Sequence, residues 1–182
     1  MSENLINLES EIGLDTLVSL FFSDPSMVGD FKLVQPAKLP EHFRFLLNHE
    51  GHMTVTLEQH YDEHVNVQVL DTRHDKRFYS RKILLDRKSD HKVVQFGIVT
   101  LDTRKLPPIT FAEIAKQETP LGRVLIDHHV HREVHLFKLY QIAAGPELAK
   151  HFGIAEGEMV AGRTAIIDCC GGPAIGLLEI VV

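Results

Sequence analysis

The chain has 182 residues, 44% of them hydrophobic and 24% charged, which predicts a single globular domain over residues 1–182 with a real core. The formal net charge of −6 argues against a protein that binds nucleic acid through a general basic field, so we expect no nucleic-acid partner. The sequence has no basic N-terminal segment, no apolar run of membrane-spanning length and only 2 cysteines, which excludes a secretory signal and a disulfide framework and predicts a cytoplasmic protein.

The first part of the chain is expected to be a helix followed by an irregular lead-in. Residues 3–22 have mostly helical apolar spacing, with Gly13 as a break. Four residues, three of them prolines, interrupt any regular pattern over 25–40 and indicate irregular chain. Residues 1–38 therefore form an N-terminal extension of the domain.

A period-two pattern follows a short predicted helix at 42–49 and a loop that Gly51 opens. Four runs alternate apolar and polar side chains, and we predict that they are strands: 54–60, 65–72, 78–86 and 93–101. The links between them are short and polar, which favours antiparallel hairpins over crossovers.

The second half mixes helices with strands. Thr110 is in position to cap a helix at 111–117, and Pro120 starts a second short helix that ends at Leu125. The remaining expected elements are a strand at 130–140, a helix at 146–152 and a hairpin of 159–168 with 174–182. The fold class is therefore α+β, with an antiparallel sheet of about six or seven strands and short helices packed over it.

Two charged residues fall in strand rows that are otherwise apolar. Alternation puts Arg81 in the row of Tyr79, Ile83 and Leu85, and it puts Glu179 in the row of Ile175, Leu177 and Val181. A buried charge is expensive unless it is paired, hydrogen-bonded or facing a ligand. The pattern leaves two interpretations open. The charges could line an enclosed polar site, or they could be structural, as an ion pair or at an edge that faces water.

The chemistry of these two side chains indicates one class of ligand. The guanidinium of Arg81 can bind a carboxylate through two parallel hydrogen bonds. A carboxylate such as Glu179 in a dry pocket can accept or share a proton. Together they predict a pocket for a small carboxylic acid that bears a hydroxyl group, without saying whether the ligand reacts.

Other motifs point to no further chemistry. His129, His131, Glu133 and His135 share a face of the strand predicted at 130–140, but a flat row spreads over ~20 Å, whereas metal ligands must converge. We expect a solvated strand face and no metal. The adjacent Cys169 and Cys170 would point to opposite faces, so we expect neither a disulfide between them nor a nucleophile.

Several short motifs follow one another from about residue 39 to the C-terminus. They are Leu46-Leu47 with His52-Met53-Thr54, Arg81-Lys82-Ile83-Leu84-Leu85, Thr119-Pro120-Leu121-Gly122-Arg123, Gly162-Arg163-Thr164 and Leu177-Leu178-Glu179. In this order and spacing the sequence resembles the chorismate lyases, the chorismate pyruvate-lyases that make 4-hydroxybenzoate. Each motif is weak alone, and the signal lies in their order.

The resemblance implies an antiparallel sheet with a ligand sealed under helical flaps. It implies a cofactor-independent carbon–oxygen lyase that converts chorismate to 4-hydroxybenzoate and pyruvate in quinone or aromatic-compound biosynthesis, as a monomer or small homo-oligomer. Arg81 and Glu179 would be the catalytic pair, at the ring carboxylate and the hydroxyl respectively. Met53 and Leu121 would contact the substrate from the flaps, with Arg163 as a second inward cation or a structural anchor.

One departure from the family and two alternatives remain. Gly97-Ile98-Val99 stands where better-known members carry a Gly-Arg-Thr-like run, so a polar contact is missing. The first alternative is a non-catalytic sensor of the same fold, as in transcription regulators with an upstream winged-helix domain, for which residues 1–38 are too short and too acidic. The second is a diverged lyase for a related cyclohexadiene acid. Fold similarity alone does not decide between them.

Overall fold

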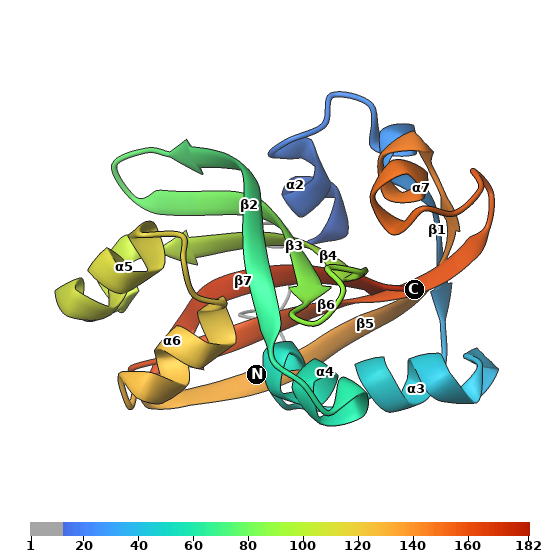
Figure 1. Cartoon of the computed structure of the whole chain (residues 1–182). Coiled ribbons are helices and arrows are strands. Elements are labelled where there is room, and N and C mark those ends of the chain that lie inside the picture. The colour runs from blue at the N-terminus through green and yellow to red at the C-terminus, as the bar shows by residue number, and fades with distance from the viewer. Residues whose placement is uncertain (1–12) are drawn as a thin grey trace.

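The computed structural model describes residues 13–182, in which seven antiparallel strands form one sheet in the order β1-β5-β6-β7-β4-β3-β2 (Figure 1). The strands are β1 (Gly29–Val34), β2 (Val65–His74), β3 (Phe78–Arg87), β4 (Val93–Asp102), β5 (Arg132–Ala144), β6 (Met159–Cys169) and β7 (Gly172–Val181). The predicted α+β class with an antiparallel sheet and short helices packed over it is confirmed.

Helices cover both faces of this sheet. On one face lie α2 (Leu14–Ser19) and α7 (Pro146–Phe152). On the other face lie α3 (Glu41–Leu47), α4 (Met53–Tyr61), α5 (Pro108–Ala115) and α6 (Leu121–Asp127). Short 3-10 turns occur at Pro25–Met27, Pro36–Lys38 and Thr103–Lys105. No helix in the described part of the chain is long and apolar enough to cross a membrane.

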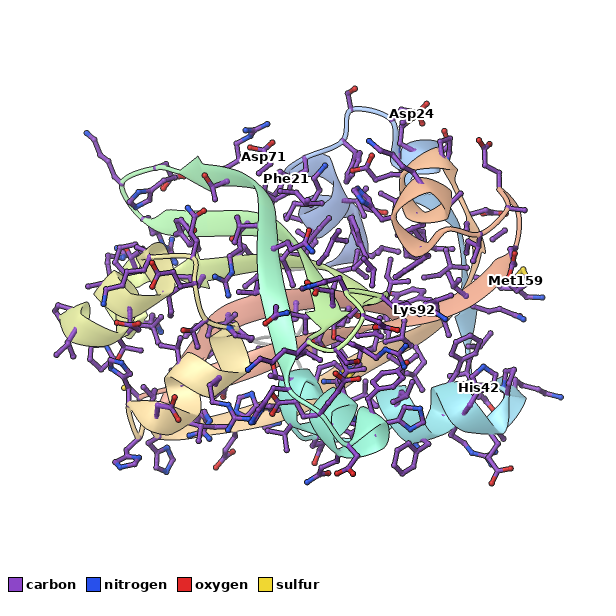
Figure 2. All side chains as sticks on the ribbon, in the orientation of Figure 1. Phe21, Asp24, His42, Asp71, Lys92 and Met159 are labelled. Carbon is purple, nitrogen blue, oxygen red and sulfur yellow. The ribbon has the colours of Figure 1, made fainter. Side chains whose placement is uncertain are left out.

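The central strands β4 and β7 are buried almost throughout, because both of their faces are covered. Ile98 and Leu178 pack toward α2 and α7, whereas their neighbours Val99 and Leu177 pack toward α5 and α6. Figure 2 shows side chains filling the space between the sheet and the helices on both faces. Burial of each such aliphatic side chain contributes roughly 1.5–3 kcal/mol, so these two strands anchor the core.

The predicted strand at 54–60 is wrong, because this segment lies in the helix α4. Three β-branched residues in a row favoured the strand interpretation. The decisive pattern is Met53, Leu57 and Tyr61, spaced four residues apart, which places the first two against the sheet as buried residues. Asp62 ends the helix in the left-handed conformation.

Two further boundaries differ from the sequence prediction. The segment 25–40, expected to be irregular, contains β1, which pairs with the long strand β5. The helix expected at 111–117 begins at Pro108, a residue suited to a first helical position, so Thr110 is buried inside the first turn and does not cap it.

The remaining elements agree with the prediction to within a few residues. The final hairpin turns at Cys170 and Gly171, whose φ values of 53° and 92° match the twist that two-residue hairpins require. The helix at 146–152 ends at Gly153 as expected. Of the helix predicted at 3–22, α2 begins directly after Gly13, and residues 3–12 lie outside the described residues.

Candidate functional site

The strand registers bring Arg81 and Glu179 onto the same face of the sheet. Arg81 on β3 lies opposite Val99 on β4, and Val99 lies opposite Leu177 on β7. One row further along, Gly97 on β4 lies opposite Glu179 on β7, and Glu179 lies opposite Arg163 on β6. The three charged residues therefore come from two neighbouring rows near the centre of the sheet.

These residues line a small cavity between the sheet and the helices. All five residues proposed from the sequence are in its wall: Arg81, Arg163 and Glu179 from the sheet, with Met53 and Leu121 from α4 and α6. Apolar side chains complete it, namely Val67, Ile83, Leu85, Val99, Val134, Ile167 and Leu177. The volume of about 40 Å³ holds only a few water molecules, so a ring-sized ligand enters only if the cover moves.

Glu179 is already paired, and its partner is Arg163. The Nε of Arg163 donates to Oε2 of Glu179 over 2.7 Å, and both side chains are buried. A buried ion pair needs such direct hydrogen bonding to offset the loss of solvation. The structural ion pair left open by the sequence therefore exists, but it joins Glu179 to Arg163 and leaves Arg81 aside.

The same guanidinium fastens the chain that leads into α4. Nη1 of Arg163 donates to the carbonyl of His49 at 2.7 Å, and Nη2 donates to the carbonyl of Gly51 at 3.1 Å. A longer bond of 3.3 Å reaches the carbonyl of Leu47. Arg163 thus ties the floor of the cavity to the loop 47–51, and it is both an anchor and part of the wall.

Arg81 is a buried cation that has no carboxylate partner among residues 13–182. Its side chain is 1% exposed, and neither Nε nor Nη1 has a hydrogen-bond partner in the described part of the protein. Burial lowers the pKa of this guanidinium from its ordinary value, because the charged form has lost its water. A guanidinium remains charged in proteins, so these unused donors are a large electrostatic cost that a bound anion would offset.

The histidine in the wall adds no charge at neutral pH. Burial, together with the nearby cations of Arg132 and Arg163, lowers the pKa of His52 to about 4. The Nε of Arg132 donates to Nε2 of His52, which must be unprotonated to accept. Two guanidinium groups against one carboxylate give the wall a net charge of +1.

The helices α4 and α6 meet directly above the cavity. A Cβ atom at Gly122 would lie 3.1 Å from Oγ1 of Thr54 and 3.3 Å from Cβ of His52, so a larger residue would require these neighbours to shift. On the outer side, Arg123 of α6 forms an ion pair with Glu58 of α4. These two contacts hold the cover closed over the apolar wall.

Sequence reasoning missed some of the wall. Gln95 is buried, lies beside Gly97 on β4, and has an Oε1 atom without a hydrogen-bond partner among residues 13–182. It interrupts an apolar strand in the same way as Arg81, so the signal was present. Thr54 and His52 were missed because the segment was interpreted as a loop and a strand.

The histidine and cysteine motifs lie outside this cavity. His129 is in a turn with φ 51°, before β5 begins, so it does not share a strand face with His135. The part of the chain that the structure describes has no group of three or more residues that could hold a metal. Cys169 and Cys170 are free thiols, and burial raises the pKa of Cys169 to about 11, which makes it unreactive.

No protein-family model matches the sequence, and no curated protein matches it. Solved structures match in fold. The effector domain of PhnF from Mycobacterium smegmatis superposes with a TM-score of 0.54 at 8% identity, covering 72% of this chain and 88% of that one. The chain spans only 64% of the whole PhnF.

Two more structures are similar over about the same part of this chain. One is a protein assigned as a transcriptional regulator from Streptomyces coelicolor, with a TM-score of 0.50, 12% identity, and coverage of 65% of this chain and 86% of that one. The other is the gene product SA0254 from Staphylococcus aureus subsp. aureus N315, with a TM-score of 0.52, 11% identity, and coverage of 65% and 82%. Such identities show a shared fold.

The prediction of an enzyme is contradicted by these neighbours, which include an effector domain and a transcriptional regulator. The geometry gives a physical reason for the correction. The carboxylate expected to act on substrate, Glu179, is held by Arg163, and the neighbouring His52 is neutral and engaged with Arg132. The chain therefore shares the fold of the effector domain of PhnF, and the prediction of a carbon–oxygen lyase is wrong.

Proposed function

We propose that this chain is a non-catalytic ligand-binding domain that senses a small carboxylic acid with an aromatic or cyclohexadiene ring in the cytoplasm. One observation carries the proposal: Arg81 is a buried cation that faces the cavity with unused hydrogen-bond donors. Because Glu179 is neutralised by Arg163, the charge that the cavity lacks is that of an anion.

The wall supports a flat, carboxylated ligand. The guanidinium of Arg81 would take the carboxylate through two parallel hydrogen bonds. Val67, Ile83 and Leu177 would contact the ring, and desolvation of these apolar surfaces adds to affinity. A ring hydroxyl at the far end would donate to Glu179, while Met53 and Leu121 would close over the ring from α4 and α6. The proposed ligand needs no metal or cofactor.

We assign the ligand-binding part of a regulator to residues 13–182, and no DNA-contacting role to them. The whole chain has a formal net charge of −6, which is unfavourable for binding to phosphate backbones. Contact with DNA or another output would belong to a different domain or a partner protein. The ligand would act by shifting the position of the cover formed by α4 and α6, which is closed over the small cavity in the present structure.

The test is a thermal-shift screen of paired compounds that differ only in charge. 4-Hydroxybenzoate and chorismate are expected to raise the unfolding temperature, whereas the neutral 4-hydroxybenzamide leaves it unchanged, because only the acids satisfy Arg81. A parallel incubation with chorismate, followed by chromatography, is expected to give no 4-hydroxybenzoate above the spontaneous rate. Equal shifts from acid and amide contradict the ligand class, and rapid turnover contradicts the non-catalytic assignment.

A further inference from the structure

The strand β1 is an end strand of the sheet, and its outer side is unpaired by any described element. It pairs with β5 along one side only, and β2 is the strand at the opposite end. Figure 1 shows β1 at one side of the molecule and α5 at the other. Asp30 and Lys32 on β1 are exposed, and Leu33 is 60% exposed, which is unusual for a large apolar side chain on a strand.

Backbone hydrogen bonds determine which residues of β1 point their peptide groups outward. The amide of Gly145 donates to the carbonyl of Val28 at 2.8 Å, whereas the amide of Ala144, opposite Gly29, donates to Glu158 on the far side. In an antiparallel ladder the inward and outward residues alternate. The outward peptide groups are therefore those of Gly29, Phe31 and Leu33.

We propose that β1 pairs antiparallel with β1 of a second copy of this chain, with Phe31 at the two-fold axis, so that the two sheets become continuous. In this register the outward groups of Gly29, Phe31 and Leu33 meet those of Leu33, Phe31 and Gly29 in the second copy. A shift by one residue would set outward groups against inward ones and lose the ladder.

The charges on β1 select this register among those that keep the ladder. Asp30 of each copy lies opposite Lys32 of the other, in non-hydrogen-bonded pairs whose Cα atoms are only about 4.5 Å apart. A shift by two residues in one direction would put Asp30 opposite Asp30, and in the other direction Lys32 opposite Lys32. Like charges directly opposite are destabilising, so β1 is self-complementary in one register.

The apolar residues fit the same register. Leu33 of each copy lies opposite Gly29 of the other, which has no side chain to obstruct it. The side chains of Asp30 and Lys32 lie on the opposite face of the strand, so neither charge is a diagonal neighbour of Leu33. The half-buried rings of Phe31 lie side by side on that face and extend the packing of Phe31 against Tyr140. The pairing leaves α4 and α6 of both copies uncovered, so it is independent of the ligand proposed above.

The test is sedimentation velocity of the full chain over a hundredfold range of concentration. The wild type is expected to show a monomer–dimer equilibrium. Lys32→Asp and Asp30→Lys each replace two attractive pairs by two repulsive ones, so each is expected to weaken dimerisation about ten-fold or more. The double variant Asp30→Lys/Lys32→Asp restores opposite charges and is expected to recover the wild-type dissociation constant.

The matched control is Lys76→Asp, which makes the same charge change in the exposed turn between β2 and β3 at the other end of the sheet, and it is expected to leave dimerisation unchanged. Circular dichroism of every variant is expected to show an intact fold, because all of the substituted residues are exposed. A wild type that stays monomeric overturns the proposal. Lys32 would then be a charge that keeps the exposed edge of β1 from pairing with other chains. Single variants that dimerise normally, or a double variant as weak as the singles, also overturn it.

Discussion

Arg163 and Glu179 lie opposite each other on β6 and β7 and share a hydrogen bond of 2.7 Å, so the carboxylate of the cavity is bound to one arginine and withheld from the other. Arg81 lies one row away, and its Nε and Nη1 donors have no acceptor in the part of the chain that the structure describes. This division of roles fixes the charge that a ligand must carry. Arg163 is therefore the structural arginine and Arg81 the proposed binding arginine, and different measurements can distinguish these two roles.

Arg81→Met is expected to stabilise the ligand-free protein. The substitution removes a buried, unpaired cation and keeps most of the apolar volume, so the free energy of unfolding should rise by about 1 to 3 kcal/mol. For a domain of this size, that corresponds to roughly 2–4 °C per kcal/mol in the unfolding temperature. Thermal and urea denaturation without ligand measure the change. A marked loss of stability would mean that Arg81 has a structural role.

Arg163→Met is expected to have the opposite effect. It leaves Glu179 buried without a partner and removes the donor that holds the carbonyls of His49 and Gly51. Breaking one side of a buried ion pair costs about 3–5 kcal/mol. Glu179→Gln is the milder companion, because its amide oxygen still accepts from Arg163. Denaturation curves in which Arg163→Met matches the wild type would contradict the anchoring role.

The burial of the site charges could be predicted from the sequence, whereas their pairing could not. Alternation along β3 and β7 placed Arg81 and Glu179 on inward faces, and both are buried. The pairing of Glu179 with Arg163 depends on which strands are neighbours and in what register, and this is set by packing across the whole sheet. The bonds from Arg163 to the loop 47–51 span more than a hundred residues, so no local pattern contains them.

The cover of the cavity was predicted only in part. Met53 and Leu121 were placed on it through the family resemblance, but α4 was interpreted as a strand from its β-branched residues. The β-propensity of single residues is a weak signal where burial against the rest of the fold decides the conformation. Leu57 is an example, because its side chain has no exposed surface and is buried on the inner side of α4. The strand β1 was missed for a related reason: the prolines around it are typical of loops, and its pairing with β5 is a long-range contact.

Arg123→Gln is expected to speed ligand release. The ion pair between Arg123 and Glu58 joins α6 to α4 at the partly exposed rim of the cover, and its loss should raise the dissociation rate a few-fold to about ten-fold. Stopped-flow measurements with 4-hydroxybenzoate give the rate. Lys116→Gln is the matched control, since it breaks the ion pair with Glu113 at the C-terminal end of α5, which does not bridge the cover. Equal dissociation rates in both variants would place the opening motion elsewhere.

The stability of the protein is expected to fall as the pH drops from 6.5 toward 4, in part because of His52. Burial lowers the pKa of His52 to about 4, so in this window the unfolded chain binds a proton that the folded protein does not. Above pH 6.5 the side chain is neutral in both states and contributes no pH dependence. Unfolding temperatures of the wild type and His52→Gln across pH 4–8 test this. The variant should lose less stability in the acid range, and parallel curves would contradict the lowered pKa.

The most direct test of the account is calorimetric titration of 4-hydroxybenzoate and 4-hydroxybenzamide into the wild type and into Arg81→Met. The wild type is predicted to bind the acid at least about a hundred-fold more tightly than the amide, because charge-assisted hydrogen bonds to Arg81 are made only by the carboxylate. In Arg81→Met this preference is predicted to disappear. A preference that survives the substitution, or a wild type that binds acid and amide alike, would contradict the claim that Arg81 selects an anionic ligand.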